Sequence, residues 1–188
     1  MNRTQTLVPG SLGAIAERDG ISIAESFLSA DVIVIVDVSG SMDAHDSRGG
    51  RSRYDVACEE LRNLQAHLPG KIAVVTFSDN VEFCPHGLPI YQGGGTDLAQ
   101  ALRFIQVADG TVRFIVISDG QPNDETQALA VARKLTSTID CIYVGPEIEY
   151  GGARFLEELA RAAGGCYTIA EKAAELADRI ETLLLKAG

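Results

Sequence analysis

The sequence predicts an α/β fold: a doubly wound, mostly parallel central sheet with helices on both faces and a short antiparallel edge strand. Two stretches, 31–37 and 112–117, are apolar without alternation, which indicates strands buried on both faces. Strand-like and helix-like segments alternate along the chain, and this alternation favours a parallel sheet with right-handed crossovers. We expect the strand order 3-2-1-4-5-6, with strand 31–37 in the middle.

The individual elements follow from the apolar runs and from the turn residues between them. A polar loop at 44–52 precedes the first long helix of the domain, which Pro69 and Gly70 end. The segment 81–84 is short and alternating, as expected of an edge strand that returns through a hairpin. The predicted strands are 31–37, 71–77, 81–84, 112–117, 139–144 and 166–169, and the predicted helices are 52–67, 99–107, 125–136, 153–163 and 172–185.

Residues 1–30 are the hardest segment to assign. Asp19 and Gly20 lie between two short apolar stretches, which fits a hairpin turn, but a loose helix followed by a strand fits equally well. We treat 1–30 as an N-terminal extension that packs on the core, and 31–188 as one domain.

Length, charge and cysteine content favour a globular domain and argue against nucleic-acid-binding, membrane and secreted proteins. With 188 residues the chain is long enough to bury a sizeable core, and its formal net charge of −10 argues against nucleic acid or an anionic membrane as a partner. No stretch has the length of a membrane helix, and the first residues lack the apolar run of a secretory signal. The cysteines form no Cys-x-x-Cys pair, so we expect free thiols in a cytoplasmic protein. We also expect the protein to be a monomer on its own.

The most informative stretch follows strand 31–37. Asp37, Ser39 and Ser41 stand at two-residue spacing where the strand ends, and ligands collect beyond the carboxyl ends of parallel strands. A carboxylate with two hydroxyls offers hard oxygen ligands, which suit Mg²⁺ or Mn²⁺. The same residue types also serve as helix caps and turn formers, so this motif alone leaves both interpretations open.

Two further polar loops make the metal interpretation more specific. Thr96 follows the glycines 93–95, which allow close approach of the backbone, and Asp119 follows the apolar strand 112–117. Asp-x-Ser-x-Ser, a downstream Thr and an Asp in a Ser-Asp-Gly turn define the metal-ion-dependent adhesion site of the von Willebrand factor A domain. Residues 30–186 resemble that family, and the single domain is similar to its bacterial stand-alone intracellular members.

The resemblance implies a function and a role for each residue. The hydroxyls of Ser39, Ser41 and Thr96 would contact the metal directly, and Asp37 and Asp119 would act through water. One position would remain for an Asp or Glu of a partner protein, and retained waters favour Mg²⁺ over Ca²⁺. The protein would then be a metal-dependent protein-binding module in a regulatory complex, beside enzymes such as AAA+ ATPases, kinases or phosphatases.

Other polar residues have simpler interpretations. Asp43 and Asp46 are expected to be solvated loop acids, although a neighbouring cation site is the alternative. Asp97 is expected to cap the following helix. His45, His67 and His86 lack ligand spacing and are expected to be surface or packing residues.

An Mg²⁺-dependent hydrolase or phosphatase acting at the same metal is the alternative function. Ser39 stands where a haloacid-dehalogenase-type phosphotransferase would need a second Asp, and Gly-x-Ser-x-Gly does not occur around Ser39 or Ser41. We therefore expect no catalytic residues and favour the binding module. An apolar stripe in the last helix predicts core packing, with a helix that shifts on binding as the alternative; it consists of Ala173, Leu176, Ile180, Leu183 and Leu184.

Overall fold

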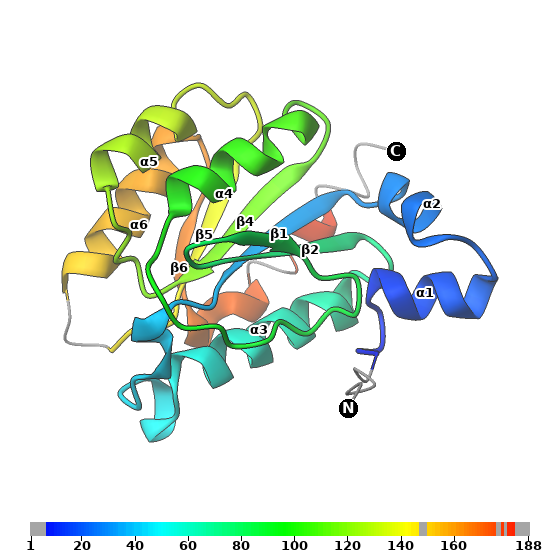
Figure 1. Cartoon of the computed structure of the whole chain (residues 1–188), viewed down its shortest axis with the longest axis horizontal. Coiled ribbons are helices and arrows are strands. Elements are labelled where there is room, and N and C mark those ends of the chain that lie inside the picture. Colours follow the sequence, from blue (N-terminus) through cyan, green and yellow to red (C-terminus); the bar gives the residue numbers. More distant parts are fainter. Residues whose placement is uncertain (1–6, 147–149, 176–177, 179, 183–188) are drawn as a thin grey trace.

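A six-stranded sheet forms the centre of the chain, in the order β3-β2-β1-β4-β5-β6 (Figure 1). In this computed structural model the described residues are 7–146, 150–175, 178 and 180–182. The strands are β1 (Val32–Asp37), β2 (Ile72–Phe77), β3 (Val81–Phe83), β4 (Arg113–Ser118), β5 (Ile139–Tyr143) and β6 (Tyr167–Ile169). Only the β2–β3 pair is antiparallel among them, so the predicted fold class and strand order are confirmed.

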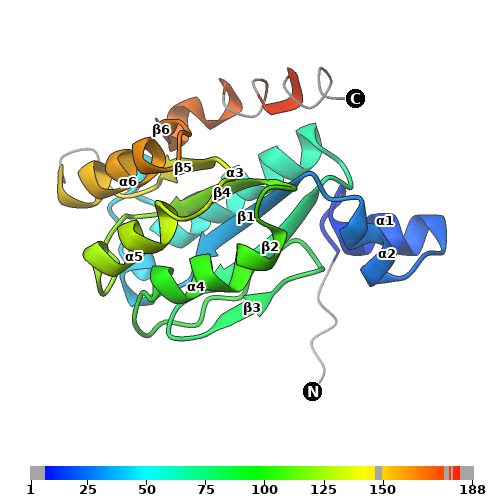
Figure 2. The ribbon, with the colours of Figure 1, turned by 90° about the horizontal axis from the view of Figure 1, so that it is seen from above.

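Helices cover both faces of this sheet. The helices α4 (Leu98–Ile105), α5 (Glu125–Ala132) and α6 (Tyr150–Ala162) lie on one face, and α3 (Arg53–His67) lies on the other (Figures 1 and 2). Short 3-10 turns follow several of these elements: η1 (Gly40–Asp43), η2 (Arg48–Gly50), η3 (Gln106–Ala108) and η4 (Ala170–Lys172). No helix within the described ranges is both long and apolar enough to span a bilayer.

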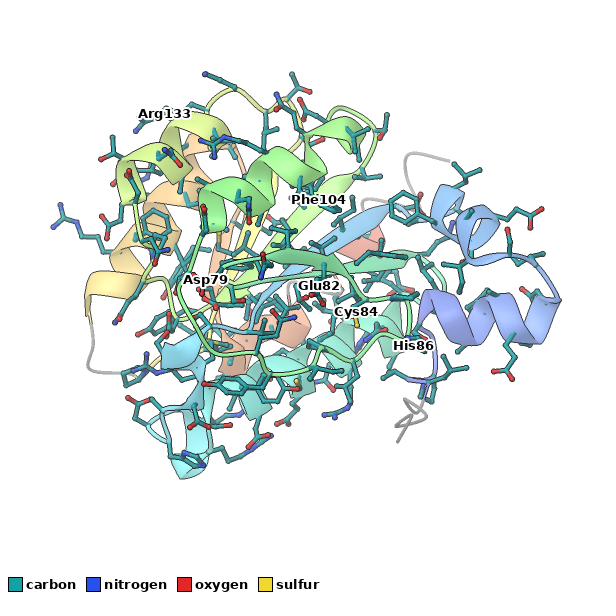
Figure 3. All side chains as sticks on the ribbon, in the orientation of Figure 1. Asp79, Glu82, Cys84, His86, Phe104 and Arg133 are labelled. Carbon is teal, nitrogen blue, oxygen red and sulfur yellow. The ribbon has the colours of Figure 1, made fainter. Side chains whose placement is uncertain are left out.

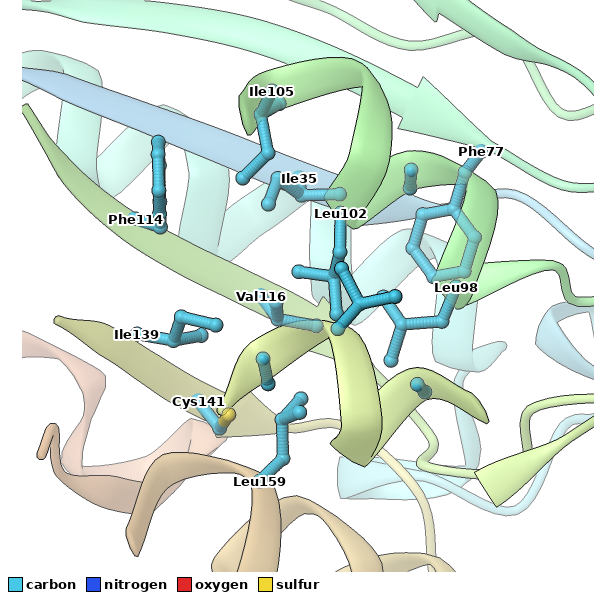
Figure 4. Packing of buried hydrophobic residues seen from close by; sticks show 14 of the residues in the cluster. Ile35, Phe77, Leu98, Leu102, Ile105, Phe114, Val116, Ile139, Cys141 and Leu159 are labelled. Carbon is cyan, nitrogen blue, oxygen red and sulfur yellow. The ribbon is translucent and has the colours of Figure 1, made fainter. Parts of the chain in front are cut away.

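The central strand β1 shows why both faces need a cover. Ile33 and Ile35 belong to the core cluster beneath α4–α6, which Figure 4 shows from close by, whereas Val34 belongs to the cluster on the α3 side. Alternate side chains of a strand point to opposite faces, so an unbroken apolar strand needs two cores. Strand β1 pairs in parallel with β2 and β4, and Val34 lies opposite Val74 and Ile115. This register sets the position of the last residue of β1 relative to the ends of its two neighbours.

The N-terminal region agrees with the sequence in the helix before Gly20 and differs from it after Gly20. It forms two helices, α1 (Leu12–Asp19) and α2 (Ile23–Leu28), with Gly20 ending α1 at φ 66°. The predicted hairpin and the predicted strand are therefore wrong. Ser22 and Glu25 form a capping box that starts α2, and this local signal outweighs the strand-like alternation of residues 21–23.

The end of helix α5 and the last described helical residues of the chain can be compared with the elements predicted from the sequence. Helix α5 ends at Ala132, earlier than predicted, because the Asp109 carboxylate accepts hydrogen bonds from the backbone N–H groups of Thr136 and Ser137. Residues 173–175, 178 and 180–182 are helical, and Ala173 and Ile180 are buried in the α3-side core. Leu176, Leu183 and Leu184 of the predicted stripe lie outside the described residues.

The cysteines are free thiols, as expected. Cys58 and Cys141 are buried, and Cys84 and Cys166 are half-buried. Burial raises the pKa of the Cys58 thiol to about 11, so this group stays protonated at neutral pH.

Candidate metal-binding site

The candidate site lies where β1 and β4 end, at the edge of the sheet opposite to α1 and α2 (Figures 1 and 2). Asp37 is the last residue of β1, and Asp119 directly follows β4. Thr96 lies in the segment that leads into α4. Since β1 and β4 are parallel neighbours, their carboxyl ends meet at one edge of the sheet.

The loop after β1 brings its polar side chains together. Asp37 and Ser39 are fully buried, and the Asp37 Oδ1 atom accepts a hydrogen bond from the Ser39 backbone N–H at 2.9 Å. The hydroxyl oxygens of Ser39 and Ser41 lie 3.3 Å apart. The turn η1 starts at Gly40 and curls the chain so that both hydroxyls point to one place. This loop therefore presents two neutral oxygens beside a buried carboxylate.

The glycine-rich segment before α4 packs directly against this loop. The Gly40 N–H donates to the Gly94 carbonyl at 3.0 Å, and the Gly93 N–H donates to the Val38 carbonyl at 2.9 Å. Gly94 has φ +82°, and a Cβ there would stand 2.3 Å from the carboxylate of Asp79, which Figure 3 labels. A side chain at Gly94 would require the Asp79 side chain to move. The predicted approach to the loop after β1 is made by the backbone, through the hydrogen bonds to Gly40 and Val38.

The loop after β4 is tied to both other segments. The Ser118 hydroxyl donates to Asp37 Oδ2 at 2.6 Å. Thr96 and Asn123 exchange two hydrogen bonds of 2.9 Å, one from the Thr96 N–H to Asn123 Oδ1 and one from the Asn123 N–H to the Thr96 carbonyl. Hydrogen bonds therefore hold the segments carrying Asp37, Thr96 and Asp119 together at this edge of the sheet.

Ser118 and Asn123 contact the predicted site residues although neither was predicted to belong to the site. Ser118 precedes Asp119 in the Ser-Asp-Gly turn, and its place at the end of an apolar strand was the available signal. Asn123 carries no signal in the sequence, because its partner Thr96 lies 27 positions earlier in the chain.

Arg53, the first residue of α3, also belongs to this region and was missed. Its Nη1 donates to Asp119 Oδ2 at 2.7 Å, and its Nε and Nη2 donate to the two carboxylate oxygens of Asp46 at 2.8 and 2.7 Å. Asp46 is exposed, as expected of a loop acid, but it is also ion-paired with Arg53, which the sequence did not predict. Hydrogen bonds from Arg53 lower the pKa of Asp46. Asp43 is exposed, as expected.

The buried carboxylate of Asp37 is electrostatically unusual. Burial raises its pKa to about 6, and the negative charge of Asp119 adds to this shift. Hydrogen bonds from Ser118 and Ser39 oppose the shift, since they stabilise the ionised form. Near neutral pH the Asp37 carboxylate is therefore ionised, close to the Asp119 carboxylate that pairs with Arg53.

The remaining polar residues have structural roles. Asp97 Oδ1 accepts a hydrogen bond from the Gln100 N–H at 2.9 Å, so Asp97 caps α4 as predicted. His45 and His67 are exposed, and His86 is half-buried. In the described part of the chain no three His, Cys, Asp or Glu side chains are placed to hold a metal ion.

Solved structures resemble this chain at low sequence identity. An aerotolerance-related membrane protein from Bacteroides fragilis with multiple mutations to serines gives a TM-score of 0.64 at 16% identity, over 84% of this chain and 99% of its own. The manganese-loaded TRAP protein from Plasmodium vivax gives 0.59 at 18%, over 79% and 71%. A von Willebrand factor type A protein from Catenulispora acidiphila gives 0.60 at 22%, over 81% and 42%.

These likenesses concern the fold. No protein-family model matches the sequence, and no curated protein matches it either. Superposition over about four fifths of this chain, with TM-scores of 0.59 to 0.64, shows that the fold is shared. The chain has a von Willebrand factor A-like α/β fold.

Proposed function

We propose that this chain is a metal-dependent protein-binding module. The metal site is formed by Asp37, Ser39, Ser41, Thr96 and Asp119, and its ligand is an Asp or Glu side chain of a partner protein. The observation that carries the proposal is the set of hydrogen bonds that ties the three segments bearing these residues together. Such bonds hold the metal-ligating side chains in place before the metal ion binds.

The chemistry of the donor set fits Mg²⁺ or Mn²⁺ better than Ca²⁺. Ser39, Ser41 and Thr96 supply neutral hydroxyl oxygens, and the two carboxylates supply negative charge beside them. When bound, the cation supplies positive charge that attracts an external carboxylate. Few protein ligands and several waters suit Mg²⁺, whereas Ca²⁺ takes more oxygen ligands. One structural neighbour, TRAP, was solved with manganese, and this supports a divalent ion of that type.

The contacts of the two aspartates hold both carboxylates in a set orientation. Asp37 accepts from the Ser39 N–H and the Ser118 hydroxyl, and Asp119 accepts from Arg53 and the Gln121 N–H. Each carboxylate oxygen keeps a second lone pair, which can accept a hydrogen bond from metal-bound water. We place the module in a cytoplasmic regulatory or ATPase-associated complex, a setting that rests on the sequence resemblance and the free thiols.

Metal-dependent capture from the source cell tests this function. The full chain serves as bait in Mg²⁺ and in EDTA, beside Thr96→Ala and the matched control Thr111→Ala. Thr96 holds Asn123 through its backbone, so its side chain can be removed while the loop contact stays. In Mg²⁺ we expect the wild type and Thr111→Ala to recover the same specific proteins. The recovered amount should be at least about tenfold lower in EDTA or with Thr96→Ala as bait.

Two results would contradict the binding module. Recovery of the same proteins in EDTA would show that no metal is needed. Turnover of a panel of phosphorylated substrates, abolished by Asp37→Ala, would instead favour the hydrolase.

A further inference from the structure

Arg53 is a buried cation at the edge of the candidate metal site. Its side chain is 7% exposed, and its partner Asp119 is fully buried, with Nη1 and Oδ2 2.7 Å apart. Asp46, on the loop between β1 and α3, takes the other edge of the guanidinium. One side chain therefore joins the loop after β1 to the loop after β4.

The backbone holds Arg53 in this place. The Arg53 N–H donates to the Ala44 carbonyl at 3.1 Å, directly after η1, and Ser52 caps the helix that Arg53 starts. Asp119 is fixed as well, because its Oδ1 accepts from the Gln121 N–H at 3.3 Å. Both oxygens of Asp119 therefore have donors within the protein, and the carboxylate has a set orientation.

A fixed positive charge at this point has two opposite consequences. It stabilises the negative charge of Asp119, which is buried close to the carboxylate of Asp37. It also repels a second cation that approaches the same pair of carboxylates, because charges within a few ångströms interact strongly where water is excluded. Assembly of the metal-free site and affinity for metal are thus coupled through one residue.

We propose that Arg53 is a positioning residue that acts as a resident cation: it assembles the site before metal arrives and weakens the binding of a divalent ion. This inference rests on the proposed function. Because Arg53 shares the negative charge of Asp119, a bound metal is less neutralised by the protein. More of its positive charge then remains for a partner's carboxylate.

Titration of Mn²⁺ into the metal-free full chain tests the proposal by calorimetry. We expect Arg53→Gln to bind Mn²⁺ about tenfold more tightly than the wild type. Without metal, the same variant should have a lower melting temperature than the wild type. Added Mn²⁺ should raise the melting temperature of the variant by more than that of the wild type. Arg51→Gln removes the same charge from an exposed neighbour that pairs with Glu59, and should bind like the wild type.

A second variant, Asp46→Asn, keeps the positive charge of Arg53 and removes one of its negative partners. Asp46 is 43% exposed, so Asp46→Asn should fold even if Arg53→Gln does not. It leaves the guanidinium less compensated, and we expect Mn²⁺ affinity to fall about fivefold. Asp55→Asn, an exposed acid in the first turn of α3, controls for net charge.

The outcomes separate this inference from the proposed function. If the wild type binds Mn²⁺ and Arg53→Gln binds it equally or more weakly, Arg53 is a structural residue only and the inference is overturned. If Arg53→Gln does not fold, equal affinities of Asp46→Asn and Asp55→Asn overturn it. If no variant and no wild-type protein binds Mn²⁺, the proposed function fails together with the inference.

Discussion

Replacing Ser39 and Ser41 together by alanine should lower the affinity of the full chain for Mn²⁺ by about 100-fold or more. The pair contributes two hydroxyl oxygens that face each other at 3.3 Å. Each hydroxyl is the other's partner, but the Ser39 hydroxyl also supports the buried Asp37 carboxylate. The double variant should therefore lower the free energy of unfolding without metal by about 1–3 kcal/mol. Calorimetric titration and thermal unfolding measure the two quantities.

A matched double variant shows whether the loss is local. Ser26→Ala with Ser29→Ala removes two hydroxyls from the region of α2, each of which donates to a nearby backbone carbonyl. We expect wild-type Mn²⁺ affinity from this control. A Ser39→Ala, Ser41→Ala protein that still binds Mn²⁺ like the wild type would show that these hydroxyls do not serve as ligands.

Gly120→Ala should destabilise the protein by about 2–5 kcal/mol, which corresponds to a melting temperature lower by roughly 5–20 °C. Gly120 has φ +76°, and a Cβ there would stand 2.1 Å from the carbonyl oxygen of Gly152 in α6. Since that neighbour is backbone, α6 or the loop after β4 would have to move. The same loop carries Asp119, so metal affinity should fall with stability.

Gly49 provides the matched comparison for this variant. It also has a left-handed backbone, φ +70°, but a Cβ there meets nothing within 4 Å. Gly49→Ala should therefore cost only the backbone strain, about 1 kcal/mol. Equal melting temperatures for the two variants would mean that the contact between α6 and the Asp119 loop contributes little.

The position of the site follows from the sequence because it depends on the sheet. An apolar strand such as β1 needs a core on each face, so it lies in the middle, and the polar residues after it must emerge between β2 and β4. The glycines before Thr96 likewise predict a close approach, which Gly94 makes to Gly40 of the loop after β1 through a backbone hydrogen bond. Local patterns therefore predicted which loops meet.

Contacts between distant side chains were beyond prediction from local patterns. Arg53 and Asp119 are 66 positions apart, and an arginine after a polar loop is an ordinary surface residue in most sequences. The error at α2 has a different cause. Ser22 and Glu25 carry the spacing of a capping box, so a search for helix starts would have found the second helix.

Diffraction from crystals of the full chain soaked in Mn²⁺, recorded for the anomalous signal of manganese, tests the central claim most directly. The account predicts one anomalous peak among the hydroxyls of Ser39, Ser41 and Thr96, with Asp37 and Asp119 reached through water. A map without a peak there at saturating Mn²⁺, or one in which the two aspartates are the only direct ligands, would contradict it.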